Sequence, residues 1–129
     1  MNFNNFTIKS QEAVQEAVNL VQSRGQQAIE PEHLMAGLLK VGENVTNFIF
    51  QKLGINGQQI ETVLDRQIAS LPKVSGGEAY LSRSANEVLQ KALEVSKELG
   101  DEYVSLEALL LALLNVKSTV ATILKDAGM

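Results

Sequence analysis

The sequence contains the same helical pattern twice. A shift of 75 positions places the segment 12–39 over the segment 87–114. Eight residues are then identical in the two copies: Glu12, Gln15, Ala17, Gly25, Glu32, Leu34, Leu38 and Leu39 recur as Glu87, Gln90, Ala92, Gly100, Glu107, Leu109, Leu113 and Leu114. A duplicated helical unit also duplicates its scaffold and any groove between the copies, which favours binding over catalysis.

Composition and charge narrow the class of protein. A chain of 129 residues with 45% hydrophobic and 20% charged residues suits one domain, which at this length buries about two-thirds of its unfolded surface. No apolar run approaches the roughly 20 residues that span a bilayer, so we expect no membrane association. The net charge of −4 is spread evenly along the sequence and repels phosphate, which argues against nucleic acid as a partner.

Cysteine usage and the first residues bear on location. The sequence contains no cysteine, which excludes a disulfide framework. The opening Met-Asn-Phe-Asn-Asn shows neither a basic leader nor an apolar signal core. The expected location is the cytoplasm.

Apolar periodicity predicts an all-helical protein. A helix is expected from about Thr7 or Ser10 to Arg24, because Gly25 can adopt the left-handed conformation that closes a helix. Pro31 suits the first turn of a second helix. The predicted buried stripe of that helix comprises Leu34, Met35, Leu38 and Leu39.

Two further helices complete the first copy. Their predicted buried positions are Val45, Phe48, Ile49 and Leu53 in the third helix and Ile60, Leu64 and Ile68 in the fourth. Gly54 closes the third helix, and Pro72 prevents the fourth from continuing into a stretch, Pro-Lys-Val-Ser-Gly-Gly, of linker composition. We therefore predict a single domain over 1–129, with repeat one at about 7–71, a linker at 72–79 and repeat two at about 80–129.

The second copy repeats the order of helices but is expected to be incomplete. Its three predicted helices are marked by Val88, Leu89, Ala92, Leu93 and Val95, by the segment after Ser105, and by Val120, Ile123 and Leu124. The segment 108–114 is apolar on every face, which places it at the centre of the fold. An eighth helix is expected to be missing, as in a piece of a longer chain. The predicted fold class is all-α, with two pseudo-repeated four-helix units and the second truncated before its last helix.

No motif predicts catalysis. His33 is the only histidine, and without cysteine a metal site would need carboxylates from several helices, so a structural role is expected for it. The acidic pairs at 30 and 32 and at 101 and 102 precede helices, where the helix dipole accounts for them. The sequence has no phosphate-binding glycine loop and no Gly-x-Ser-x-Gly elbow. We expect no catalytic residue, metal, ATP or other cofactor within these residues.

The apolar residues exceed what one core accommodates. Phe48 and Phe50 are two positions apart on a helix and cannot face the same way, and Leu110 and Leu111 point in adjacent directions. Some of these side chains are therefore expected near the surface, where a cluster of a few hundred Å² acts as a contact site.

Several stretches of the sequence resemble a known family. They are Phe-Thr at 6–7, Ile-Glu-Pro-Glu-His-Leu-Met-Ala-Gly-Leu-Leu at 29–39, Leu-Pro-Lys-Val at 71–74 and Gly-Asp-Glu-Tyr-Val-Ser-Leu-Glu-Ala-Leu at 100–109. Together they resemble the amino-terminal domain of the Clp ATPases, over essentially the whole chain. Within that family, the linker and the ending Leu-Lys-Asp-Ala-Gly are most similar to the protein disaggregases.

The resemblance implies an accessory domain of a hexameric AAA+ ring, whose ATP-binding modules lie outside this chain. It also implies a hydrophobic groove that captures exposed apolar segments of unfolded or aggregated proteins for threading. The matching residues are Thr7, Asp101 and Glu107 as polar groove residues and Leu89 and Leu110 as apolar contacts. The pattern departs at Ala108, which is smaller than the bulky apolar residue expected after Glu107.

Three other functions are open at this stage. A protease-linked Clp ATPase would use the same domain to bind a folded adaptor protein. A structural helical repeat would mediate self-association, whereas the client-binding function goes with a monomeric fragment. An enzyme would need polar residues that converge in a pocket, which nothing in the sequence predicts.

Overall fold

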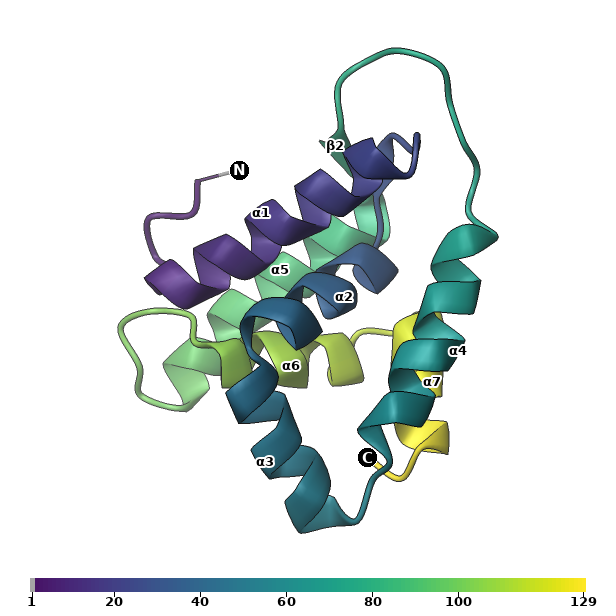
Figure 1. The fold of residues 1–129 in the computed structure, drawn as a ribbon. Helices are drawn as coiled ribbons and strands as arrows, with labels where there is room; N and C mark the ends of the chain where they lie inside the picture. The colour runs from purple at the N-terminus through teal and green to yellow at the C-terminus, as the bar shows by residue number, and fades with distance from the viewer. Residues whose placement is uncertain (1) are drawn as a thin grey trace.

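The computed structural model describes residues 2–129, which form seven helices and one small parallel sheet (Figure 1). In chain order the elements are α1 (Ile8–Ser23), β1 (Ala28–Ile29), α2 (Pro31–Val41), α3 (Glu43–Leu53), α4 (Gly57–Ala69), β2 (Tyr80–Leu81), α5 (Arg83–Glu98), α6 (Leu106–Asn115) and α7 (Thr119–Asp126). The all-α class is confirmed. The two-stranded sheet is an addition that the sequence pattern does not predict.

The first helix begins and ends where the sequence predicts. The side chain of Thr7 accepts a hydrogen bond from the amide of Ser10 and so caps the start of α1. Gly25 follows the end of α1 with φ +67°, a conformation that costs glycine little. The amide of Gln26 then donates to the carbonyl of Val21 at 2.9 Å, which satisfies one of the last free carbonyls of the helix.

Helices α1 and α2 form a tightly packed pair. Gly37 of α2 lies against the backbone of α1, where an added Cβ would be 2.2 Å from the carbonyl oxygen of Ala13 and 3.2 Å from the amide nitrogen of Ala17. Only a residue without a side chain allows this approach. The predicted stripe of α2 is buried, namely Leu34, Met35, Leu38 and Leu39.

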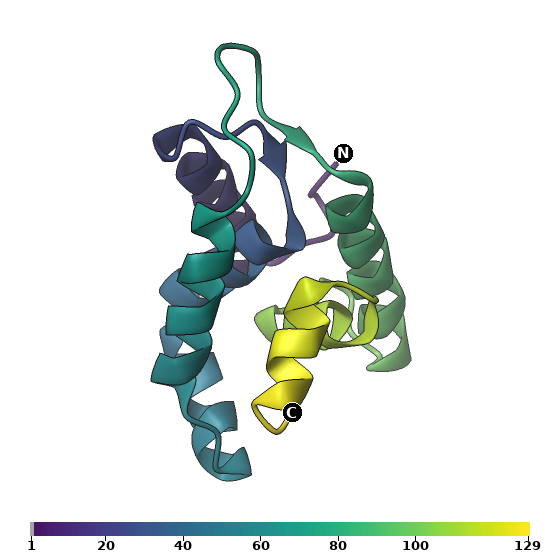
Figure 2. The same cartoon turned by 90° about the vertical axis from the view of Figure 1, so that its right-hand side faces the viewer.

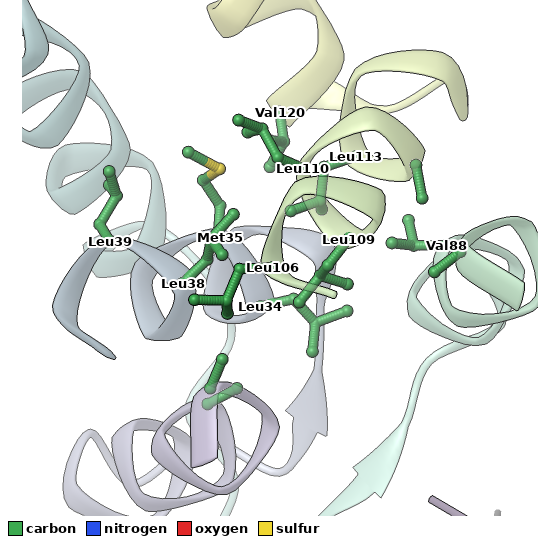
Figure 3. Close-up of a cluster of buried hydrophobic side chains, with 14 of the residues drawn as sticks. Leu34, Met35, Leu38, Leu39, Val88, Leu106, Leu109, Leu110, Leu113 and Val120 are labelled. Atoms are coloured by element: carbon green, nitrogen blue, oxygen red, sulfur yellow. The ribbon is translucent and has the colours of Figure 1, made fainter. Parts of the chain in front are cut away.

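Helix α6 lies at the centre of the molecule, as its composition predicts. Its side chains Leu109, Leu110 and Leu113 are buried. Figure 3 shows these leucines between Met35 of α2 and Val88 of α5. Because burying one such side chain stabilises a fold by about 1.5–3 kcal/mol, this cluster accounts for much of the cohesion between the copies.

The two copies are joined by exchanged backbone pairing. Ile29 of the first copy pairs with Leu81 of the second in the parallel sheet, and Phe6 pairs with Val104 in an isolated parallel bridge. Adding 75 to 29 and to 6 gives 104 and 81, so the two pairings occupy equivalent places in the repeat. In each pairing, an extended segment of one copy therefore pairs with a segment of the other. The strands are two residues long, too short to show an alternating pattern in the sequence.

Helix α4 packs against α2 and α7 through its predicted stripe. The three residues of that stripe, Ile60, Leu64 and Ile68, are all buried. Residues 70–79 then form a loop without helix or strand, which arches away from the helices before β2 (Figures 1 and 2). The segment expected as a linker lies within this loop.

The stripe predicted for α3 is only partly correct. Val45 and Ile49 are half-buried and pack against the core, but Phe48 and Leu53 are 61% and 53% exposed. The helix buries Thr46 and Phe50 instead. Phe50 turns toward Gly57 at the start of α4. Helix α4 of the first copy covers α2 and α7. Among residues 2–129 the second copy has no equivalent helix that would cover α6 and α3, so the other side of α3 has no helix beside it. The expected divergence of Phe48 and Phe50 is confirmed.

Candidate polypeptide-binding surface

Two of the five predicted site residues lie in the core. Leu89 of α5 and Leu110 of α6 are 0% and 2% exposed. The expectation that these leucines offer apolar contacts to a client is corrected, because in this structure core side chains surround both of them. The adjacent Leu111 is exposed, so the expected divergence of Leu110 and Leu111 is confirmed.

The amide and hydroxyl of Thr7 both form hydrogen bonds within the domain. Its amide donates to the carbonyl of Val104 at 3.0 Å, and its hydroxyl donates to the hydroxyl of Ser10 at 2.9 Å while accepting from the Ser10 amide. These bonds fix the start of α1 against the loop that precedes α6. The hydroxyl of Thr7 therefore serves the helix start in this structure, and its contact with a client stays a prediction.

Asp101 and Glu107 are the two predicted residues whose side chains reach solvent. Neither carboxylate takes part in an ion pair with any of residues 2–129. Asp101 follows Gly100, and its amide donates to the carbonyl of Ser96 at 2.8 Å, which holds the loop after α5 in place. Glu107 lies in the first turn of α6, where a carboxylate also complements the helix dipole.

Three large apolar side chains lie exposed where the two copies meet near Thr7 and Asp101. They are Ile8, Leu99 and Tyr103, with exposed fractions of 76%, 51% and 48%. The bridge between Phe6 and Val104 brings the start of α1 beside the loop that follows α5. We call Ile8, Leu99 and Tyr103 the junction patch. No pattern in the sequence singles out these three residues as a site.

The internal repeat provides a control for this patch. The residues 75 positions away from Ile8, Leu99 and Tyr103 are Arg83, Arg24 and Ala28. Both corners have the same backbone pairing and the same helix ends, because Ser82 donates to Ile29 as Thr7 does to Val104, each at 3.0 Å. At the first-copy corner, Arg83 and Ala28 thus stand in place of Ile8 and Tyr103, and Arg24, in place of Leu99, pairs with Asp65 of α4. Comparing the two copies for surface differences, in addition to identities, would have found the patch.

A second exposed apolar region lies on α3. Phe48 projects from α3, and the ammonium group of Lys52 lies 5.6 Å from the centre of its ring. Phe48 also lines a cleft of about 400 Å³ with Val45, Ile49 and Glu107. The predicted residue Glu107 therefore lies beside α3, whereas Asp101 lies at the junction patch.

His33 has the structural role expected from the sequence. Its Nδ1 accepts from the amide of Glu30 at 2.9 Å, which leaves the proton on Nε2, 2.7 Å from Oε1 of Gln26. Gln26 Nε2 in turn donates to the carbonyl of Ile68 at 2.7 Å, so one network ties α2, the loop after α1 and the end of α4 together. Burial, and to a smaller extent the charge of Arg24, lowers the pKa of His33 from 6.5 to about 4.

Glu32, next to His33, also has a shifted pKa. Burial raises its pKa, and hydrogen bonds to its own backbone amide and to Gln67 partly oppose that shift. The amide Nε2 of Gln67 lies 3.5 Å from the Glu32 carboxylate. The equivalent residue in the second copy is Glu107, which is exposed because no helix covers it among the described residues.

The placement of the acidic side chains and the length of the helices bear on metal binding and on membrane insertion. Among residues 2–129, no group of three or more His, Cys, Asp or Glu side chains is placed to hold a metal ion. Within the same range, no single helix is long and apolar enough to cross a membrane; α6 and α7 together meet that criterion by length and composition, with a 98° bend between them.

Comparison with known proteins establishes the family. The model of the Clp repeat (R) N-terminal domain matches residues 5–127. The chain is 81% identical over 129 residues to the chaperone protein ClpB of Bacteroides thetaiotaomicron and 52% identical over 128 residues to ClpB of Porphyromonas gingivalis. These matches take in 100% and 99% of this chain and 15% of each relative. The chain belongs to the Clp N-terminal domain family, and its sequence is that of a ClpB-type amino-terminal domain.

Solved structures share this fold. The Hsp104 N-terminal domain from Candida albicans aligns with a TM-score of 0.86 at 23% identity, covering 98% of this chain and 83% of that one. The ClpV N-domain in complex with a VipB peptide aligns with a TM-score of 0.78 at 19% identity, covering 98% and 81%. At these identities the likeness concerns the architecture. The resemblance inferred from the sequence motifs is confirmed.

Proposed function

We propose that this domain is a non-catalytic, polypeptide-binding module that captures exposed apolar segments of unfolded or aggregated proteins at the junction patch. The chain spans 15% of the ClpB relatives it matches. Threading driven by ATP, hexamer formation and a cytoplasmic location are proposed for the longer protein that carries such a domain. Membership of the Clp N-terminal family and the chaperone relatives support this proposal.

The main support for this proposal is the difference between the two equivalent corners of the fold, at the Thr7–Val104 and Ser82–Ile29 pairings. Ile8 is exposed at one corner, and Arg83 occupies the same position at the other. A large apolar side chain in water is unfavourable, and the Arg83 corner shows that this scaffold forms without it. An exposed apolar cluster that folding does not require is typical of a contact surface.

The chemistry of the patch suits weak and unselective binding. Burying about 300 Å² of apolar surface gives about 7 kcal/mol gross at 25 cal/mol per Å². Ordering a flexible client and losing its translational freedom oppose most of that gain. Asp101, beside the patch, can accept hydrogen bonds from the backbone amides of any client, because every sequence has them.

The test converts the patch into the equivalent corner of the other copy. The triple variant Ile8→Arg, Leu99→Arg, Tyr103→Ala carries the residues that the first-copy corner already tolerates. Binding of a reduced, carboxymethylated protein that stays unfolded is followed by NMR on the labelled domain. We expect wild-type shifts around the patch at micromolar to millimolar client and at least a tenfold loss of affinity in the variant.

The matched control is Arg83→Ala, which alters the equivalent exposed position and should leave client binding unchanged. Equal binding by the triple variant, or shifts confined to Phe48 and its cleft, would refute the junction patch as the site. A strong one-to-one complex with one folded protein, without affinity for unfolded chains, would favour an adaptor partner. The solved complex of the ClpV N-domain with a VipB peptide shows a Clp-type N-domain with a defined partner segment.

A further inference from the structure

A second and larger groove lies on the first copy, away from the junction patch. It has a volume of about 1160 Å³ and is bounded by α1, α2, α3 and α4. Helix α4 packs against α2 and α7, and its link to the end of α1 is the ion pair between Arg24 and Asp65 together with the hydrogen bond from Gln26 to Ile68. These contacts join the end of α1 to α4 at one end of the groove.

The α2 wall of the groove includes a small, half-buried residue, Ala36. The residue equivalent to Ala36 in the second copy is Leu111, which would fill part of such a space. Pockets for small molecules typically measure 300–1,000 Å³ and enclose the ligand. An open trough above that range fits a segment of polypeptide better than a small molecule.

The charge of the lining is unbalanced. Lys40 lies 3.1 Å from Glu16, and Arg24 pairs with Asp65, so both cations of the groove are neutralised by its own carboxylates. Glu43 on α3 and Glu61 on α4 line the groove without an ion-pair partner among residues 2–129. Two free carboxylates on different walls attract a cationic occupant.

The remaining lining is suited to a peptide backbone. Asn47 and Gln58 offer amide groups that both donate and accept hydrogen bonds. Leu20 and Ala36, which are half-buried, contribute apolar surface to the floor. An extended segment with alternating side chains can place apolar residues on that floor and Lys or Arg side chains toward the acidic walls.

We propose that the groove between α1, α2 and α4 is a second polypeptide-binding site, which takes extended segments that combine Lys or Arg with apolar residues. The site is separate from the junction patch, so it does not depend on the proposed function. It gives the domain two points of attachment with different preferences, one apolar and one cationic. Two weak sites on one scaffold raise the effective concentration of a long client at each of them.

The test uses fluorescein-labelled hexapeptides with the domain as it stands. The peptide Lys-Leu-Lys-Leu-Lys-Leu should bind and shift the NMR signals of Asn47, Gln58 and Glu61, and Glu-Leu-Glu-Leu-Glu-Leu should not. Glu43→Gln and Glu61→Gln should each weaken the lysine peptide about twofold to fivefold, as expected for exposed ion pairs. The loss should shrink as salt is raised, because salt screens exposed charges.

Two controls separate this site from the other. Glu94→Gln removes an exposed carboxylate of α5, outside the groove, and should leave peptide binding unchanged. Ile8→Arg alters the junction patch and should also leave lysine-peptide binding unchanged, whatever it does to unfolded clients. Circular dichroism melting checks that the variants stay folded.

Three results would overturn the proposal. They are equal affinity for the two peptides, no effect of Glu43→Gln together with Glu61→Gln, and shifts that cluster at Ile8 and Tyr103. Spermidine is the competitor for a simple cation site. If spermidine produces the same shifts and the peptide binds no tighter, the groove attracts cations in general and the peptide site is refuted.

Discussion

The amide of Thr7 donates to the carbonyl of Val104 at 3.0 Å. This bond joins the start of the first helix to a loop almost one hundred residues later in the chain. The equivalent bond of the repeat runs the other way, from the second copy to the first, through Ser82 and Ile29. Because each copy anchors the other, the position of the junction patch depends on both halves of the chain. The two helix caps beside these bonds can therefore be compared directly.

Thr7→Ala removes the cap of α1 and is expected to lower the free energy of unfolding by about 1 kcal/mol, the usual cost of losing an N-cap side chain. Chemical denaturation measures it. Ser82→Ala removes the equivalent cap of α5 and should cost about the same. If Thr7→Ala leaves stability unchanged but lowers client affinity, the hydroxyl of Thr7 contacts the client after all.

Leu110→Gln should destabilise the fold, because the amide would be buried without partners in the space now filled by the leucine. We expect a loss of about 2–5 kcal/mol in the free energy of unfolding. Leu111→Gln is the matched control. The side chain of Leu111 is 36% exposed, so this substitution should change the free energy of unfolding by no more than about 0.5 kcal/mol. A stable Leu110→Gln variant with weakened client binding would restore Leu110 to the binding surface.

Gly37→Ala should also destabilise the protein, by about 1–3 kcal/mol. The new Cβ would meet the carbonyl oxygen of Ala13 at 2.2 Å, so α1 and α2 would have to separate. The gain in helix propensity on replacing glycine, up to about 1 kcal/mol, works in the opposite direction. Thermal unfolding is the readout, with the exposed Gln22→Ala in α1 as the control. An unchanged or raised melting temperature would show that the two helices are not held at this distance.

His33 gives a pH prediction with a direct measurement. Its pKa is lowered from 6.5 to about 4, so between these pH values the unfolded chain binds more protons than the folded one. The stability that it contributes is complete above pH 6.5 and is lost as the pH falls to about 4, by about 3 kcal/mol in all. The imidazole signal of the single histidine should titrate near pH 4 in the folded protein. Titration near 6.5 would contradict the buried network.

Glu32 affects the pH dependence of stability in the direction opposite to His33 over part of the same pH range. Because burial raises its pKa, the folded state holds that proton more tightly, and the group costs stability as the pH rises above its ordinary 4.5. Measuring the pH dependence in the Glu32→Gln background removes this effect and leaves that of His33.

Features set by local sequence patterns are predicted correctly, whereas features set by packing between helices are not. Helix ends marked by Gly25 and Pro31 and the core stripes of α2 and α4 are local patterns, and the sequence predicts them correctly. The stripe of α3 is predicted correctly only at Val45 and Ile49, because burial there depends on which helices lie beside it. Periodicity alone does not carry that information.

The site was harder to predict for a related reason. Leu89 and Leu110 fit a family pattern, but whether an apolar residue faces a groove or the core depends on rotations of a fraction of a helical turn. The exposed residues Ile8 and Tyr103 have no motif of their own. Their signal lies in the contrast with Arg83 and Ala28, which becomes meaningful once the structure shows that the two corners are equivalent.

The exchange of segments between the two copies has a consequence for how such a chain arose. A single ancestral unit, paired with an identical unit across a two-fold axis, would make both the Ile29–Leu81 contact and the Phe6–Val104 contact at once. The present architecture has the pairing that two such subunits would have if the loop 70–79 joined them in one chain. Within one chain the two interfaces need not be identical, and here one corner carries Ile8 and Leu99 where the other carries Arg83 and Arg24.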